Sequence, residues 1–128
     1  MSAGRHFPSF LVTAGGRLRA VPILSGRFEF AMEMRRAFAE HEPTDVVVDL
    51  PGAMAGAMGR AVERLPCLSV IRLQEESSGE QSFFLVEPSD GLTEAVRLAR
   101  EHALPLHCAD RDAARVHIGS GPCPTPTP

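Results

Sequence analysis

The feature that most constrains the fold is a run of valines between two stretches of helical periodicity. Residues 45–50 read Asp-Val-Val-Val-Asp-Leu, which is typical of a strand buried on both faces of a parallel sheet. Before this run, apolar residues recur at helical spacing from Phe30 to His41, and Pro43 ends the pattern. After it, Pro51 suits the first turn of a second helix. A strand between two helices predicts βαβ units with right-handed crossovers.

The rest of the chain continues this alternation of strands and helices. We expect a first strand at residues 21–24, and Asp90 is expected to cap a third helix before a last strand at 106–109. Strands at 68–73 and 82–86 are joined by a polar turn that is too short for a parallel crossover. These two strands are expected to form a hairpin. The predicted fold class is therefore α/β, with a mostly parallel sheet, helices packed on it, and a hairpin between strands three and four.

The length of 128 residues predicts one domain with flanking segments. Residues 1–20 are read as an N-terminal extension or hairpin, with a strand at 10–13, and residues 21–118 as the α/β domain. The segment 119–128 combines glycine and serine with alternating proline and threonine, so we expect a Pro-rich disordered tail or linker.

Charge and composition argue against several classes of function. The net charge is −3, all 13 basic residues are arginines scattered along the chain, and Trp and Tyr are absent, so no nucleic-acid binding is expected. No apolar run approaches the roughly 20 residues of a membrane span, and no convincing signal peptide precedes the domain, so a cytoplasmic location without membrane contact is expected. Three cysteines without a CxxC motif indicate neither a disulfide framework nor a zinc ribbon.

Acidic residues follow several of the predicted strands. Asp49 follows the valine run, Glu87 follows residues 82–86, and Asp110 and Asp112 follow the last strand. Ligands bind at the carboxyl ends of strands in open α/β sheets, and carboxylates gathered there can hold a divalent metal or share acid and base roles. We therefore name Asp49, Glu87 and Asp110 as candidate catalytic residues, and Asp49, Asp110 and Asp112 as candidate metal ligands. The alternative is that these side chains cap helices or lie in solvent.

Two further segments are candidates for anion binding. Arg27, with Glu29 two residues later, follows a predicted strand end and opens a helix, where an anion could bind. The glycine-rich residues 52–59 also open a helix, but their spacing is neither GxGxxG nor GxxxxGK[ST]. Close packing of this helix on the sheet is therefore favoured over a nucleotide site.

Several short motifs resemble a known superfamily. They are Pro43-Thr-Asp45-Val-Val-Val-Asp49-Leu-Pro51, Val86-Glu87-Pro88 and Ala103-Leu-Pro105-Leu-His-Cys-Ala-Asp110. In this order they resemble the opening segment of bacterial members of the superfamily that includes TraB/PrgY, TIKI, erythromycin esterases and ChaN, over about residues 21–112. The active members carry Gly-x-x-His after the first strand and Glu after the second. This chain has Glu29 and Asp49 at those places.

Two functional hypotheses follow. The resemblance implies metal-assisted hydrolysis, in which the strand-end carboxylates hold a divalent metal and its water while Arg27 and Glu29 line the pocket. The alternative is a non-catalytic protein-interaction module, as a homo-oligomer or with another protein, or a fragment of a larger protein. The missing histidine, the short length and the Pro-rich end favour that alternative. A fragment that lacks half of a sheet is expected to expose an apolar edge and to associate through it.

Overall fold

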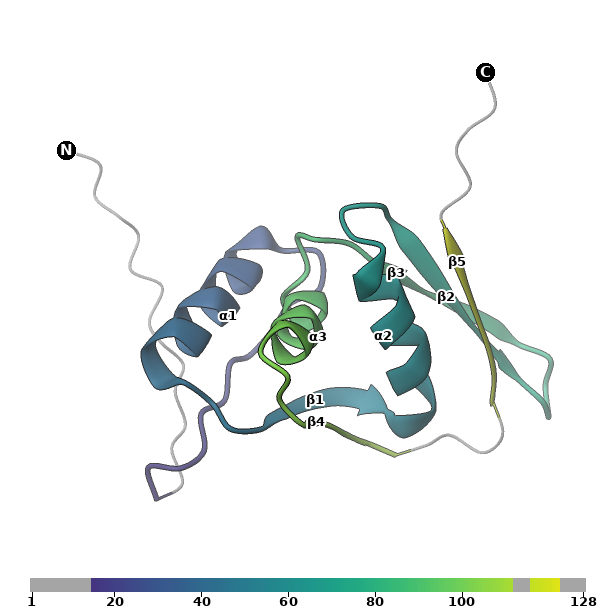
Figure 1. Ribbon diagram of the computed structural model, residues 1–128. Coiled ribbons are helices and arrows are strands. Elements are labelled where there is room, and N and C mark those ends of the chain that lie inside the picture. The colour runs from purple at the N-terminus through teal and green to yellow at the C-terminus, as the bar shows by residue number, and fades with distance from the viewer. Residues whose placement is uncertain (1–14, 112–115, 123–128) are drawn as a thin grey trace.

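The computed structural model describes residues 15–111 and 116–122, and these form a mixed α/β arrangement (Figure 1). Its elements, in chain order, are α1 (Phe28–His41), β1 (Val46–Pro51), the short 3-10 helix η1 (Gly52–Met54), α2 (Ala55–Glu63), β2 (Ser69–Glu75), β3 (Gln81–Val86), α3 (Gly91–Glu101), β4 (Leu106–Asp110) and β5 (Val116–Pro122). The three predicted helices are all present. Among the helices of the described residues, none combines the length and apolarity that a membrane span requires.

The strands form two separate sheets. In sheet A, β1 and β4 pair in parallel, from Val46 opposite Leu106 to Pro51 opposite Asp110. In sheet B, the order is β3-β2-β5 and both pairings are antiparallel. The predicted hairpin between residues 68–73 and 82–86 is thereby confirmed. The prediction of a mostly parallel sheet is wrong, because only one of the three strand pairings among the described residues is parallel.

The helices of residues 15–111 cover one face of sheet A and leave the other face without a helix (Figure 1). Figure 1 shows α1, α3 and α2 on the same side of β1 and β4. Burial accordingly alternates along β1: Val46, Val48 and Leu50 are buried, whereas Val47 is 58% exposed. The expectation that this strand is buried on both faces is therefore wrong. A run of valines suits a strand buried on one face as well as one buried on both faces. The second face of β1 is exposed because the described part of the chain has no second layer of helices (Figure 1).

Both ends of the predicted domain differ from expectation. Residues 21–24 do not form a strand, although Ile23 packs beside the start of α3. At the other end, residues 119–122 belong to β5, which pairs with β2, and not to a disordered tail. Strand pairing supplies hydrogen bonds that the composition of this segment did not indicate. The predicted strand at 10–13 and the end of the predicted tail, 123–128, lie outside the described residues.

One hydrophobic core joins the two sheets. It contains the inner face of β1, the buried faces of α2 and α3, and the inner residues of sheet B; Met58, Ile71, Val86 and Val96 are fully buried. Helix α2 contacts every strand of sheet B. Gly59 lets Arg100 of α3 lie against this helix, since a β-carbon there would come within 2.9 Å of the guanidinium. This contact joins α2 to α3, so the expected close packing of residues 52–59 on the sheet stays a prediction.

The start of α3 ties three segments together. The buried carboxylate of Asp90 accepts a hydrogen bond from the backbone N–H of Thr93 at 2.9 Å and another from that of Gly26 at 3.2 Å. The predicted cap of this helix is thus confirmed. Gly91 follows, and a β-carbon there would lie 3.0 Å from Cβ of Phe30 and 3.2 Å from its backbone carbon. Helices α1 and α3 can approach this closely because residue 91 has no side chain.

We therefore expect Gly91→Val to lower the free energy of unfolding by about 1–3 kcal/mol, the usual cost of overpacking. The same change at Gly121 is the control, because a β-carbon there meets no atom within 4 Å. Gly121→Val should alter stability by less than about 0.5 kcal/mol. Urea unfolding followed by circular dichroism measures both variants, and equal effects would contradict the close approach at Gly91.

Candidate functional site

Sheet A brings two of the predicted site residues to one end. Because β1 and β4 run parallel, Asp49 and Asp110 both lie near the carboxyl ends of their strands, and Asp110 is opposite Pro51. Both residues are exposed. The carboxylate of Asp110 accepts a hydrogen bond from the backbone N–H of Arg111 at 2.8 Å. Asp112, the third predicted metal ligand, lies outside the described residues.

The other predicted residues gather at the start of α1. Glu87 follows β3, and its Oε1 lies 3.6 Å from the position that a β-carbon on Gly26 would take. Arg27 and Glu29 form an exposed ion pair with a distance of 3.4 Å between Nη2 and Oε1. Figure 1 shows this end of α1 far from the carboxyl end of β1. Glu87 is therefore separated from Asp49 and Asp110, because β3 belongs to sheet B and runs antiparallel to β2.

The described carboxylates do not make a metal site by themselves. Within residues 15–111 and 116–122, no group of three or more His, Cys, Asp or Glu side chains could hold a metal ion. Asp49 and Asp110 are the part of the predicted set that lies together. No hydrolytic step through a metal follows from this arrangement, and the role of Asp112 stays a prediction.

The pKa directions of two exposed carboxyls, Glu29 and Asp45, argue against a general-acid role for them. A hydrogen bond from its own backbone amide and one from Arg27 hold the pKa of Glu29 below its ordinary value. On the outer side of sheet A, hydrogen bonds from His107 and Thr44 do the same for the pKa of Asp45, whose Oδ1 lies 3.0 Å from Nε2 of His107. Both carboxyls are ionised at neutral pH, so neither is suited to act as a general acid there.

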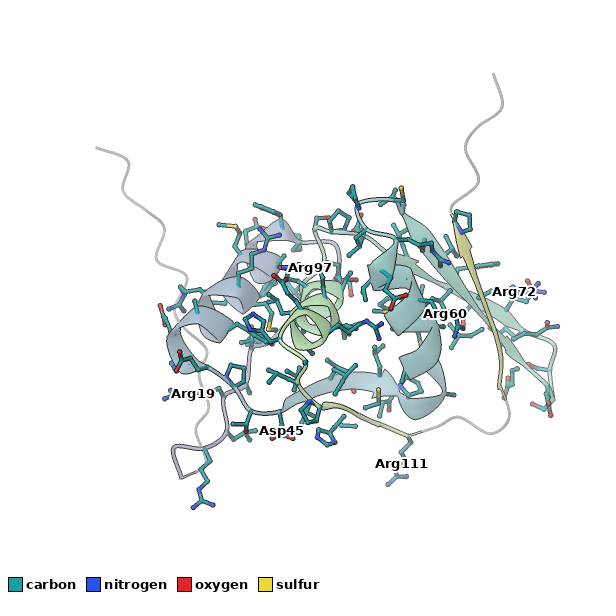
Figure 2. The ribbon with its side chains drawn as sticks, viewed as in Figure 1. Arg19, Asp45, Arg60, Arg72, Arg97 and Arg111 are labelled. Atoms are coloured by element: carbon teal, nitrogen blue, oxygen red, sulfur yellow. The ribbon has the colours of Figure 1, made fainter. Side chains whose placement is uncertain are left out.

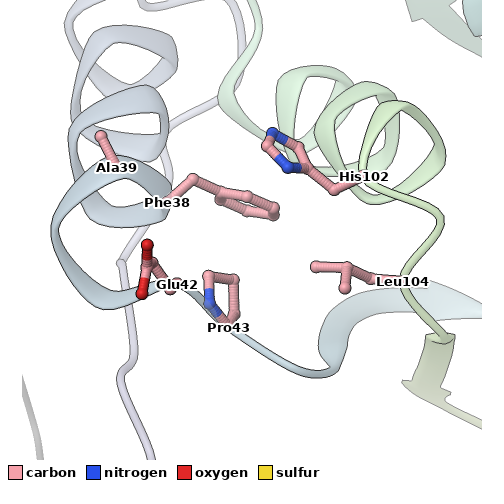
Figure 3. Close-up of a pocket in the computed structure, with 6 residues that line it drawn as sticks. All are labelled: Phe38, Ala39, Glu42, Pro43, His102 and Leu104. Atoms are coloured by element: carbon pink, nitrogen blue, oxygen red, sulfur yellow. The ribbon is translucent and has the colours of Figure 1, made fainter.

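A shallow pocket of about 320 Å³ lies between the ends of α1 and α3 (Figure 3). It is lined by Phe38, Ala39, Glu42, Pro43, His102 and Leu104. The ring of His102 packs toward that of Phe38, with 5.8 Å between centroids. In Figure 3 the Glu42 carboxylate and the His102 imidazole lie on different sides of the Phe38 ring. The two polar groups do not converge on one point, so the pocket lacks the arrangement that catalysis needs.

The open edge of β3 is an exposed sheet edge of the kind expected for an interaction module, but the sequence did not indicate which strand would supply it. Strand β3 lies at one side of sheet B, and no strand of the described residues pairs with its far edge. Its six residues include no charged residue, no proline and no glycine, and its pairing with β2 has no bulge. Natural proteins usually protect sheet edges with charged residues, prolines or bulges, because an unprotected edge can pair with other chains. The absence of charge was visible in the sequence, but the edge position was not.

Strand β3 itself exposes two large apolar side chains. Phe83 is 66% exposed and Leu85 is 45% exposed, and they lie opposite Arg72 and Val70 of β2. Figure 2 shows Arg72 pointing away from α2. We call this surface the outer face of sheet B; it consists of Leu68, Val70, Arg72, Phe83 and Leu85. The alternate residues of β3 face the core, where Val86 is fully buried. Exposed apolar clusters of this kind mark interaction surfaces.

Comparisons of this chain with models of known protein families, with curated proteins and with solved structures find no match. The resemblance to the TraB and erythromycin esterase superfamily thus stays a prediction from its short motifs.

Proposed function

We propose that this chain is a protein-interaction module that binds an extended segment of a partner along the open edge of β3. One observation carries the proposal: the edge strand β3 is regular and uncharged, and its own Phe83 and Leu85 side chains are exposed. In strand addition, backbone hydrogen bonds supply affinity and alternate side chains supply specificity. The edge of β3 offers the backbone hydrogen bonds, and the outer face of sheet B offers the side-chain contacts.

The side-chain pattern describes the segment that would fit. Paired residues of neighbouring strands share a face, so every second residue of the segment would lie beside Phe83 and Leu85. Those residues should be apolar. Arg72 is exposed on the same face, directly opposite Phe83, and suits a carboxylate at the rim of the bound segment. The preferred partner is an extended segment with alternating apolar residues and little positive charge.

The hydrolase hypothesis has weaker support. Its favourable observation is the parallel pair that brings Asp49 and Asp110 to one end of sheet A. Against it, Glu87, Arg27 and Glu29 lie elsewhere, and the described residues supply too few ligands for a metal. Strand addition needs no residue beyond those described in β2 and β3.

The proposal predicts which peptides this chain selects and where they bind. A random peptide library is selected against the whole chain, and the selected peptides are titrated into isotope-labelled protein by NMR. We expect peptides with apolar residues at alternate positions that shift the backbone amides of β3. Phe83→Lys should weaken their binding at least about tenfold, a loss of about 1.4 kcal/mol. An empty selection, or peptides that bind another surface, would contradict the proposal.

Phe28→Lys provides the matched control. Phe28 is 53% exposed on α1, so the substitution has the same chemistry and a similar exposure at a different surface. Neither variant removes a buried side chain, so both should keep the fold. Equal losses of peptide affinity in the two variants would show that added charge, and not the edge of β3, weakens binding.

A further inference from the structure

We infer that the segment paired with β3 is β3 of a second copy of this chain, in an antiparallel arrangement with a two-fold axis at Phe84. This inference rests on the proposed function and names its partner. The interface would be isologous, since the same strand contributes from both subunits. It would join two three-stranded sheets into one continuous antiparallel sheet.

Symmetry restricts the register. A two-fold axis perpendicular to the sheet places one residue of β3 opposite itself, and all other pairs follow from that residue. With the axis at Phe84, Phe83 lies opposite Leu85 of the partner subunit, and Ser82 lies opposite Val86 of the partner subunit. Aromatic and aliphatic residues paired across strands stabilise a sheet. The two exposed apolar residues of β3 thereby cover each other on the outer face.

The neighbouring register is less favourable. An axis at Phe83 would leave Leu85 opposite Gln81 of the partner subunit, and Val86 opposite Glu80 of the partner subunit. Each of these pairs places an apolar side chain against a polar one. Both registers overlap five residues of the strand with themselves. The register at Phe84 is favoured because it matches the exposed apolar residues on the outer face.

Charge permits two copies of β3 to pair. Residues 81–86 carry no charge, so two copies can approach along this strand without repulsion. The nearest charges are Glu80 and Glu87 at its two ends. With the axis at Phe84, Glu80 lies opposite Pro88 of the partner subunit, and Glu87 opposite Gln81 of the partner subunit. No two carboxylates are directly opposite, an arrangement that would destabilise the pairing.

The mass of the full chain in solution tests the inference. Sedimentation equilibrium from sub-micromolar to hundreds of micromolar protein should show a monomer that becomes a dimer as concentration rises. Phe83→Lys should raise the dimer Kd at least about tenfold, because it brings a cation to each side of the axis. Phe28→Lys should leave the Kd unchanged. A wild-type chain that stays monomeric over this range, or equal effects of the two variants, would overturn the inference.

Cross-linking tests the register. In a background with the native cysteines replaced by serine, a Phe83→Cys chain is mixed with a Leu85→Cys chain and oxidised gently. The axis at Phe84 predicts that the mixed dimer forms much faster than either homodimer, because positions 83 and 85 face each other across the interface. Fast cross-linking of Phe83→Cys with itself would place the axis at Phe83 and overturn the proposed register.

The two proposals fail in different ways. If the wild-type chain is monomeric but selected peptides still bind along β3, the second-copy partner is wrong and the strand-addition function stands. If neither peptides nor a second copy engage β3, both proposals are wrong. Circular dichroism of each variant shows whether the fold is kept, so loss of folding is not mistaken for loss of binding.

Discussion

Arg97→Met is expected to lower the free energy of unfolding by about 3 kcal/mol, because it leaves a buried carboxylate short of partners. The Glu94 side chain is only 1% exposed. It accepts hydrogen bonds from Nε and Nη2 of Arg97 at 2.9 and 2.7 Å, and one from Nε of Arg35 at 2.7 Å. The network joins α3 to α1. Without Arg97, only the bond from Arg35 would remain to offset the burial of the charge.

An exposed ion pair supplies the control for this prediction. Arg36 bonds Glu33 and Glu40 on the outer side of α1, where all three side chains contact solvent. Arg36→Met should cost less than about 1 kcal/mol, as is usual for surface pairs. Urea unfolding with an unchanged m-value measures both variants. Equal losses of unfolding free energy in the two variants would mean that the ion pairs of the buried Glu94 stabilise the fold no more than exposed ion pairs do.

The same network predicts a pH dependence. Burial by itself would raise the pKa of Glu94, but hydrogen bonds and charges from Arg97 and Arg35 outweigh burial and hold this pKa below its ordinary value. A pKa that is lower in the folded chain stabilises the fold above the unfolded value of about 4.3 and loses that contribution as pH falls through the folded value. The stability difference between wild type and Arg97→Met should therefore narrow in acid. A stability difference between the two proteins that stays constant from neutral pH to below about pH 4.3 would contradict this account.

Ile71→Ala is the second large expected effect, with a loss of about 2–5 kcal/mol in unfolding free energy. Ile71 is fully buried on the inner face of β2, within the core that joins sheet B to α2. Truncation loses the free energy gained by burying the removed methyl groups. It also leaves a cavity that the central strand of a sheet cannot easily close. This variant tests whether the inner face of β2, and not its outer face, holds the sheet to the domain.

Val70 is the matched position on the same strand. It lies on the outer face of sheet B, opposite Leu85, and is only partly buried. Val70→Ala should cost less than about 1 kcal/mol in the monomer, since its methyl groups already contact water. Chemical unfolding of dilute samples measures both variants below the concentration of any self-association. A larger loss for Val70 than for Ile71 would reverse the assignment of the two faces.

The candidate site could be predicted only in part. Asp49 and Asp110 were expected at neighbouring strand ends, and the parallel pairing of β1 and β4 places them at one end of sheet A. Glu87 was named with them as a catalytic candidate, although the expected hairpin directs the end of its strand to the other edge of the sheet. It lies near Gly26, because β3 pairs within another sheet. An exposed apolar sheet edge was expected for an interaction module, but the strand that supplies it was not predicted. The sequence marks residues 81–86 as an apolar strand, but whether its edge is covered depends on which other strands join the sheet.

Local patterns determined the elements, and contacts distant along the chain determined their assembly. Helical spacing and prolines were sufficient for α1 and α2, Asp90 was sufficient for the start of α3, and a short polar turn was sufficient for the hairpin. These signals act within a few residues, so they can be read directly. The pairing of β5 with β2, the uncovered face of β1 and the open edge of β3 were decided only in the tertiary structure. Each depends on which surfaces meet across the chain, and hydrophobic periodicity specifies that a face is to be buried without specifying what buries it.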